Sequence, residues 1–199
     1  MAELLIRHFG YYYTAAFGAG GALTLRVFKD ILLVNGGKHP LGYEAFYIAR
    51  EQTTREIVGC LLFHTRESCT PLKNITSAVG SAFVVLRHLG VVGLMRTFRN
   101  LRTLGTELPA LGPDELQIVY LAVSPAMRGK HVGTRLVEHI RNAPGGQNKG
   151  VLRLEVRESN EVARQFFGSL GFAEDGLKTS PGDAILGRGA RVQMTRIAR

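Results

Sequence analysis

The spacing of apolar residues predicts two helices and a strand hairpin at the start of the chain. Residues 3–17 are apolar and tyrosine-rich and are expected to form a helix, which the glycine-rich stretch 18–21 ends. From Leu23 to Val34 apolar positions recur at helical intervals. Residues 43–50 and 57–64 have the apolar pattern of strands, and the short polar segment between them suits a hairpin turn. This order of elements predicts an α/β fold.

The second half of the chain has two successive strand–helix pairs. Strands are predicted over residues 116–123 and 152–157, and each is followed by a segment with apolar residues on one helical face. A further strand is expected near Leu177, a turn over 179–183, and a closing strand over 191–197. The spacing of the two strand–helix pairs suits one β-α-β unit.

A long segment, residues 66–114, separates the hairpin from the next strand. It has no acidic residue from Ser68 to Thr106. Gly90 and Gly93 are expected to bend or divide a helix there. Its apolar residues at roughly helical spacing are Val84, Val85, Leu89, Val92, Leu94, Met95, Phe98 and Leu101, and its basic residues are Lys73, Arg87, Arg96, Arg99 and Arg102. The segment predicts a helical insertion that covers one side of a cleft, a basic amphipathic surface that touches a membrane, or a homodimer interface.

The composition narrows the class of protein without choosing a ligand. The chain has 199 residues, which suits one domain, and its net charge of +9 favours anionic partners. Its 2 cysteines are too few for a disulfide framework and suit a cytoplasmic protein. The first residues include Glu3 and only a short apolar run without a basic start, so we expect no signal peptide. Arg87 and His88 interrupt the longest apolar run, 78–94, so we also expect no membrane-spanning helix. Nucleic-acid binding would rest on charge alone, and we expect none.

The segment 124–134 carries the chemistry that is easiest to interpret. An apolar strand stops at Ser124–Pro125, a short basic loop with Arg128 and Lys130 follows, and an amphipathic helix then begins. The free N–H groups at a helix start bind anions, and the helix dipole adds about 0.3–1 kcal/mol. We therefore expect a phosphate at this loop. Gly129 permits a tight turn, and Gly133 removes a side chain where the backbone approaches the ligand.

This loop resembles the pyrophosphate-binding signature of the GNAT superfamily of acetyl-CoA-dependent N-acetyltransferases. Arg128 fits the first position of that signature and Gly133 the last. His131 stands where the family usually has its middle glycine, and we expect it to keep a helical backbone that still offers its N–H group.

A second segment strengthens the resemblance. The stretch Leu-Glu-Val-Arg, residues 154–157, precedes Ser159–Asn160, Ala163, an aromatic pair and Gly171–Phe172. This order of residues is especially similar to that of the bacterial ribosomal-protein N-terminal acetyltransferases, and the similarity extends over about residues 115–175. Gly171 suits a left-handed C-terminal helix cap.

The resemblance implies the fold, the cofactor and its contacts. The fold is an α/β GNAT fold, a mixed central sheet flanked by helices, as a single domain over 1–199 with the insertion 66–114 between the family's third and fourth strands. Acetyl-CoA enters where the family's fourth and fifth strands part, and no metal is required. The strand backbone then contacts the pantetheine arm, the loop wraps the pyrophosphate, and Asn160 hydrogen-bonds the arm. The implied cofactor-binding residues are Leu121, Ala122, Val123, Arg128, Gly129, Lys130, His131, Val132, Gly133, Thr134, Asn160 and Phe167.

The resemblance also identifies candidate catalytic residues. Glu155 matches the general base proposed for ribosomal-protein acetyltransferases, and the alternative is a surface strand residue paired with Arg153 or Arg157. Phe167, which we also expect in the core, stands where many members have the tyrosine that protonates the leaving thiolate. Three alternatives follow for protonation of the thiolate. Tyr120 replaces the missing tyrosine as proton donor, the thiolate leaves to solvent unprotonated, or the protein binds CoA with little catalysis. Gln117 occupies the base position of histone-type members, and an amide cannot accept the proton.

The expected function is acetyl transfer from acetyl-CoA to a primary amine. A bulky insertion over the acceptor cleft favours a small molecule or amino sugar over a long peptide. The alternatives are a catalytically weak acyl-CoA sensor and a membrane-surface protein. His64, His88 and His139 are isolated in the sequence and are expected in structural or surface positions.

Overall fold

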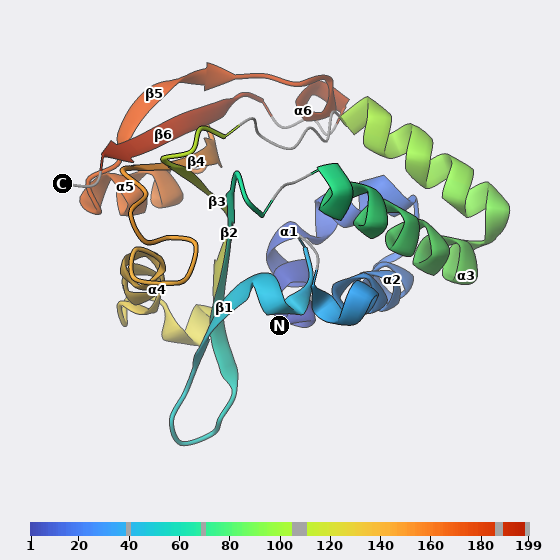
Figure 1. Cartoon of the computed structure of the whole chain (residues 1–199), viewed down its shortest axis with the longest axis horizontal. Helices are drawn as coiled ribbons and strands as arrows, with labels where there is room; N and C mark the ends of the chain where they lie inside the picture. Colours follow the sequence, from blue (N-terminus) through green and yellow to red (C-terminus); the bar gives the residue numbers. More distant parts are fainter. Residues whose placement is uncertain (39–40, 69–70, 105–110, 186–188, 198–199) are drawn as a thin grey trace.

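A mixed sheet forms the centre of the computed structural model, which describes residues 1–38, 41–68, 71–104, 111–185 and 189–197 (Figure 1). The strands lie in the order β1-β2-β3-β4-β6-β5. They are β1 (Phe46–Arg50), β2 (Ile57–Thr65), β3 (Glu115–Val123), β4 (Val151–Arg157), β5 (Ala173–Lys178) and β6 (Arg191–Ile197). The β3–β4 pair is parallel and the other neighbouring pairs are antiparallel. The mixed sheet and the closing antiparallel strands confirm the predicted fold class.

Helices cover both faces of the sheet, as Figure 1 shows. On one face lie α4 (Val132–Ile140) and α5 (Glu161–Ser169), and their buried side chains share one core with β3, β4 and β6. On the other face lie α1 (Ala2–Phe17), α2 (Gly21–Leu33) and α3 (Pro71–Leu104), which enclose a second core. Short 3-10 turns occupy Val34–Gly37, Tyr43–Ala45 and Pro125–Met127. The 3-10 turn at Tyr43–Ala45 makes β1 begin three residues later than the predicted strand.

A bulge in β3 changes which face of the sheet its side chains meet. Tyr120 pairs with Leu62 and Ile118 pairs with Phe63, so Val119 is the extra residue. Before the bulge Ile118 packs in the α4–α5 core, whereas after it Tyr120 and Ala122 lie on the α1–α2–α3 side. A bulge bends its strand and increases the local twist, so it redirects the end of β3.

The predicted helical insertion is confirmed as α3, and it is divided at one glycine. Gly90 has φ 67 and ψ −176, a conformation that only glycine adopts readily, whereas Gly93 lies within a helical arm. Figure 1 shows two arms that turn back on each other at the far right of the molecule. We name this element the α3 hairpin, with a first arm up to Leu89 and a second arm from Val91 to Leu104.

Polar contacts hold the α3 hairpin on the neighbouring helices. The Asn100 side-chain amide donates to the carbonyl oxygens of Ala15 (2.9 Å) and Ala16 (3.3 Å) at the end of α1. The His88 ring lies 2.7 Å from the carboxylate of Asp30 on α2.

The expectation of no helix long enough to span a membrane is wrong. Among the described residues, the segment Ile75–Leu104 is long and apolar enough to cross a membrane, judged by its length and composition alone. The positions of Arg87 and His88 do not interrupt the helix; Gly90 does.

The predicted turn over 179–183 is in part a short helix, α6 (Pro181–Ile185). Two reciprocal hydrogen bonds begin it: Ser180 N–H donates to the Asp183 carboxylate (2.9 Å), and Asp183 N–H donates to the Ser180 hydroxyl oxygen (3.3 Å). Ser-Pro-Gly-Asp is a capping box with proline at the first helical position, a signal that was present in the sequence.

Candidate functional site

The two parallel strands of the sheet separate at their carboxyl ends. Their pairing runs from Glu115–Val151 to Ile118–Leu154 and stops there. The last part of β3 continues against β2, and the last part of β4 continues against β6. The separation begins at the β3 bulge, so strand-edge backbone groups of β3 beyond Ile118 and of β4 beyond Leu154 face a gap rather than each other. Ligands bind at the carboxyl ends of parallel strands in α/β sheets.

The loop after β3 ends at a helix terminus that is open to an anion. Helix α4 begins at Val132 without a side-chain cap, and its first turn closes when Arg135 N–H donates to the His131 carbonyl (3.0 Å). The N–H groups of Val132, Gly133 and Thr134 therefore precede the first intrahelical bond. Arg128 and Lys130 are exposed beside them. Backbone donors, the helix dipole and two cations together fit a pyrophosphate.

The conformation of His131 differs from the expected helical one. It has φ 58 and ψ 15, the left-handed region that glycine occupies most easily. Gly129 is also left-handed, with φ 74. The chain thus keeps the backbone path of a glycine at position 131 despite the imidazole.

The absence of a side chain at Gly133 has a packing reason in addition to the predicted approach of a ligand. A Cβ there would lie 3.1 Å from the Phe166 ring of α5 and 3.7 Å from a methyl group of Val123. Gly133 is buried, so α4, α5 and the end of β3 meet at this point.

Two of the predicted cofactor residues also have structural contacts. The Asn160 side chain caps α5 by accepting a hydrogen bond from Ala163 N–H (3.2 Å), and Asn160 itself is exposed. Phe167 is buried in the α4–α5 core, where its ring centroid lies 5.5 Å from that of Phe172. The expectation that Phe167 packs in the core is confirmed.

Tyr120, the candidate proton donor, lies beneath α1 among aromatic rings. Its hydroxyl oxygen is 2.7 Å from that of Tyr13, and its ring contacts Phe9 and stacks on Phe46. Burial raises the pKa of Tyr120 above its ordinary value, so the phenol is protonated at neutral pH.

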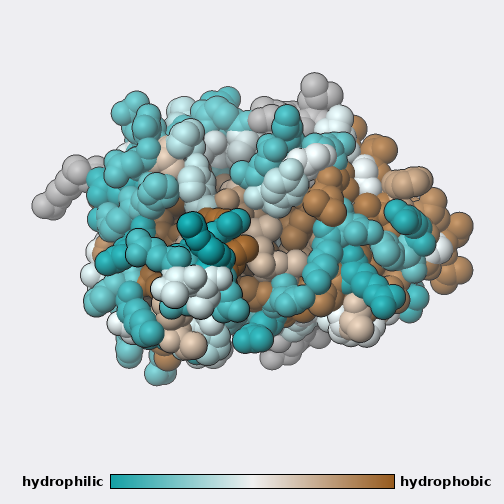
Figure 2. All heavy atoms as spheres, turned by 90° about the horizontal axis from the view of Figure 1, so that it is seen from below, coloured by the Kyte–Doolittle hydropathy of each residue, from teal (hydrophilic) through white to brown (hydrophobic). Residues whose placement is uncertain are grey.

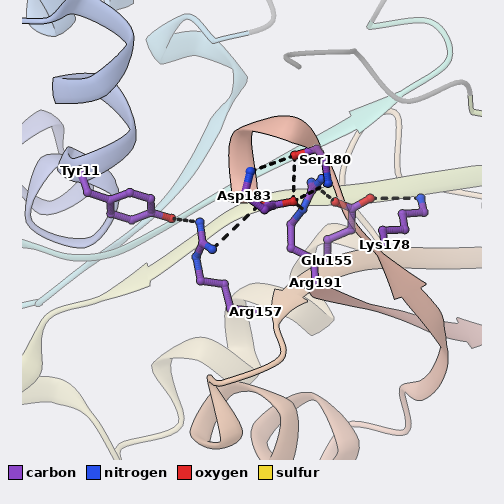
Figure 3. A network of polar contacts seen from close by, with 7 residues as sticks. All are labelled: Tyr11, Glu155, Arg157, Lys178, Ser180, Asp183 and Arg191. Atoms are coloured by element: carbon purple, nitrogen blue, oxygen red, sulfur yellow. Dashed lines mark hydrogen bonds and ion pairs between the residues drawn. The ribbon is translucent and has the colours of Figure 1, made fainter. Parts of the chain in front are cut away.

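Glu155, the candidate base, is held by two cations, as Figure 3 shows. One carboxylate oxygen accepts from Arg191 of β6 at 2.5 Å, and the other accepts from Lys178 of β5 at 3.1 Å. Glu155 is thus an ion-paired strand residue, as the alternative expected, but its partners are Lys178 and Arg191 rather than Arg153 or Arg157. Arg153 pairs with Glu115 at 2.6 Å, and Arg157 lies 4.0 Å from Asp183.

Asp183 links this carboxylate to the start of α6 (Figure 3). It accepts from the Arg191 guanidinium at 3.1 Å and from the Ser180 hydroxyl at 2.8 Å. Burial acts to raise the pKa of Asp183, but the Ser180 hydrogen bonds and the charge of Arg191 outweigh burial, and the pKa is lowered. Arg191 therefore bridges two carboxylates and fixes where the Glu155 carboxylate lies.

Helix α1 reaches the ends of both separated strands, which the sequence did not show. His8 lies near the backbone of Val123 at the end of β3, and its Nε2 is buried without a partner among the described residues. Tyr11, one helical turn later, points its hydroxyl at Arg157 at the end of β4 and accepts a hydrogen bond from the guanidinium at 3.4 Å (Figure 3). The guanidinium carbon lies 5.3 Å from the Tyr11 ring centroid. Burial, and then the charge of Arg128, lowers the pKa of His8. The pKa of Tyr12 is raised, chiefly by burial.

A pocket of about 240 Å³ adjoins Glu155 on the α1–α2–α3 side of the sheet. Its lining is Leu111, Gln117, Arg153, Leu154, Glu155, Lys178 and Gln193. A larger cavity of about 440 Å³ includes Asp114 and Gly150, which precede β3 and β4. It therefore lies at the opposite end of the parallel strands from the α4 terminus, and the smaller pocket is the one beside the candidate base.

The three histidines singled out in the sequence, His64, His88 and His139, lie in separate parts of the structure. His88 pairs with Asp30, and the His139 ring meets Tyr47 edge-on. His64 is buried in β2. Across the described part of the chain, no group of three or more His, Cys, Asp or Glu side chains is placed to hold a metal ion.

Comparison with known proteins gives the family. The acetyltransferase (GNAT) family pattern matches residues 25–172. Uncharacterized protein ML0378 of Mycobacterium leprae (strain TN) is 38% identical over 73 residues, 37% of this chain and 20% of that protein. N-alpha-acetyltransferase RimI of Mycobacterium tuberculosis (strain ATCC 25618 / H37Rv) is 35% identical over 66 residues, 33% of this chain and 40% of that protein. The matches thus span less than half the length of either curated relative.

A solved acetyltransferase structure has the same fold. It superposes with a TM-score of 0.66 at 15% identity and covers 100% of this chain and 93% of that one. The match to the family pattern extends over most of the chain, from α2 to the end of α5, and includes both the α4 loop and the Asn160 segment. The chain belongs to the acetyltransferase (GNAT) family.

Proposed function

We propose that the protein transfers an acetyl group from acetyl-CoA to the primary amine of a small polar molecule. The observation that carries the proposal is the separation of β3 and β4 directly above the uncapped start of α4. A thioester supplies an activated acyl carbon, and the strand edge and the helix terminus together offer backbone donors along an extended cofactor. A cytoplasmic location belongs to the same proposal, supported by the free, buried thiol of Cys60.

Two segments, the end of β3 and the α4 loop, bind and position the cofactor in this proposal. Backbone groups of Leu121, Ala122 and Val123 hold the pantetheine arm and polarise the thioester oxygen. The α4 loop, with Arg128 and Lys130, binds the pyrophosphate. His8 lies beside the end of β3 on the α1 side, near Val123.

Proton transfer needs a proton acceptor for the amine and a proton donor for the leaving thiolate. The amine nitrogen attacks the thioester carbon, and the C–S bond breaks. Glu155 accepts the proton from the amine through a water molecule, because both carboxylate oxygens already accept from cations and each keeps a further lone pair. Tyr120 is the candidate that donates a proton to the leaving thiolate; burial raises its pKa, which keeps the phenol protonated and also makes it a weaker acid.

The pocket beside Glu155 favours a small acceptor. Its volume of about 240 Å³ is below the range of roughly 300–1,000 Å³ for drug-sized ligands. Its lining carries Arg153, Lys178 and Gln193, which suit a polar molecule with oxygen acceptors. The relative RimI is named an N-alpha-acetyltransferase, so a peptide amine is the competing acceptor class.

The test combines cofactor binding with turnover. Calorimetry with acetyl-CoA should show micromolar binding that is lost in Arg128→Glu/Lys130→Glu and kept in Arg50→Glu, an exposed arginine on β1. Thiol release is then measured with amino sugars, small amines and short peptides as acceptors. Turnover with small amines only supports the proposal. Turnover with peptides only overturns the acceptor class, and binding without turnover would make the protein an acyl-CoA sensor.

A further inference from the structure

The outer surface of the α3 hairpin is strongly apolar and belongs to no core of the protein. Its exposed apolar residues are Ile75, Val79, Phe83, Leu86, Val91, Val92, Met95 and Phe98, with exposed fractions between 39% for Leu86 and 75% for Val92. In Figure 2 brown residues gather at the end of the molecule that the α3 hairpin occupies in Figure 1. We name this set the outer surface. Contiguous apolar patches of this kind mark interaction sites.

The two faces of each arm differ in the way an amphipathic helix requires. Residues 75, 79, 83 and 86 follow helical spacing along the first arm, and 92, 95 and 98 do so along the second. The inner positions Val85, Thr97 and Leu104 are buried. The protein core therefore uses one face of each arm and leaves the other face exposed.

The charge of the α3 hairpin has one sign. Arg87, Arg96, Arg99 and Arg102 are exposed, and no acidic residue occurs from Ser68 to Thr106. The nearest acidic partner on a packed helix, Asp30, is 2.7 Å from His88. The outer surface thus combines exposed apolar side chains with unbalanced positive charge.

We propose that the outer surface of the α3 hairpin docks the protein on an anionic lipid bilayer. Apolar side chains at the surface enter the boundary between headgroups and acyl chains, and arginines pair with anionic headgroups. A second copy of the chain fits less well, because a symmetric contact between two such surfaces would place arginines opposite arginines with no acidic residue of the hairpin between them.

The hairpin lies on the membrane rather than crossing it. Gly90 turns the chain, so the arms do not form one continuous rod. The inner face is held by Asn100 on α1 and His88 on α2. Crossing the bilayer would require the hairpin to leave these contacts and to expose the core beneath α1.

The first experiment is cosedimentation of the full chain with vesicles. The protein should bind phosphatidylglycerol–phosphatidylcholine vesicles at least about tenfold more tightly than pure phosphatidylcholine, and added salt should weaken binding. Met95→Asp/Phe98→Asp and Arg99→Glu/Arg102→Glu should each lose at least about tenfold in affinity. The matched controls are Ile197→Asp, an exposed apolar residue at the end of β6, and Arg50→Glu, and both should bind as the unmodified protein does.

Contact with lipid can also be followed by fluorescence, because the chain has no tryptophan. Phe98→Trp should shift its emission to shorter wavelength when anionic vesicles are added, and Ile197→Trp should not. Circular dichroism and acetyl-CoA affinity verify that each variant is folded.

Three outcomes overturn the proposal. The first is no binding of the unmodified protein to anionic vesicles at low salt. The second is equal binding by Met95→Asp/Phe98→Asp. The third is a dimer in sedimentation velocity that this variant dissociates, without vesicle binding, since the outer surface would then be an interface between two copies. All three outcomes are independent of whether the protein transfers acetyl groups.

Discussion

Replacing His131 with glycine should stabilise the protein without changing acetyl-CoA binding. His131 has φ 58 and ψ 15, is exposed, and makes no side-chain cap to α4. The pyrophosphate site proposed above uses backbone N–H groups of the α4 start, and glycine supplies the same N–H group. The substitution therefore relieves backbone strain and leaves the donors in place.

The magnitude follows from two opposing contributions. The left-handed conformation costs an L-residue about 1–2 kcal/mol. Glycine loses about 0.5–1 kcal/mol more backbone entropy on folding. We expect a net gain of about 0.5–1 kcal/mol, which corresponds to a rise in Tm of about 1–4 °C for a chain of this length.

His131→Ala separates the backbone effect from the imidazole. Alanine removes the ring but keeps the Cβ and the strain, so its Tm should not rise. Thermal unfolding by circular dichroism gives the Tm of each protein, and calorimetry gives acetyl-CoA affinity. Equal Tm values for His131→Gly and His131→Ala would refute the strain argument. An equal loss of affinity in both variants would show that the imidazole itself binds the cofactor.

Three further predictions concern the candidate acid, the candidate base and their support. Glu155→Gln should lower kcat by about 100-fold or more with little change in KM for acetyl-CoA, measured by thiol release; an unchanged kcat would remove Glu155 from proton transfer. Tyr120→Phe and Tyr13→Phe break the same 2.7 Å hydrogen bond, so each should lower the free energy of unfolding in urea by about 1 kcal/mol. Only Tyr120→Phe should also lower kcat. Equal kcat values in the two variants would exclude Tyr120 as the proton donor. Because the folded-state pKa of Asp183 is lowered, its stabilisation is complete above the unfolded pKa of about 3.9 and is lost as pH falls through the folded pKa. The difference in urea midpoint between the unmodified protein and Asp183→Asn should therefore be constant above about pH 5 and shrink below pH 4, and a difference that does not change with pH would contradict this assignment.

The order of elements was predictable because each element has its own local pattern. The alternation in β4 places Leu152, Leu154 and Val156 in the α4–α5 core, and the closing strand β6 has the bounds that its sequence pattern predicts. Gly171 has φ 84, as a left-handed helix cap requires. In contrast, the β3 bulge depends on how β2 and β3 pair, and the residues around Val119 give no local sign of it.

The site was predictable only where it follows directly from one strand. The α4 loop and the Asn160 segment both follow strands, so their places in the fold could be predicted from the strand–helix pattern, whereas their cofactor roles came from the family resemblance. The contacts of His8 and Tyr11 with the ends of β3 and β4 depend on how α1 crosses the sheet. Tyr11–Tyr12–Tyr13 was visible as an aromatic cluster, but no spacing rule connects it to Arg157.

The residues that carry the family signature have structural contacts that would persist without any catalysis. Asn160 caps α5, Gly133 admits the Phe166 ring, and Phe167 fills the α4–α5 core. Matching the signature therefore supports the fold more directly than it supports a particular acceptor. The groups that would decide the acceptor lie elsewhere, on α1 and on the β5–β6 segment that positions Glu155 through Lys178 and Arg191. Substitutions there, rather than in the signature, will distinguish a small-amine acetyltransferase from a peptide acetyltransferase or a sensor, because they change the acceptor side of the site while the cofactor side stays intact.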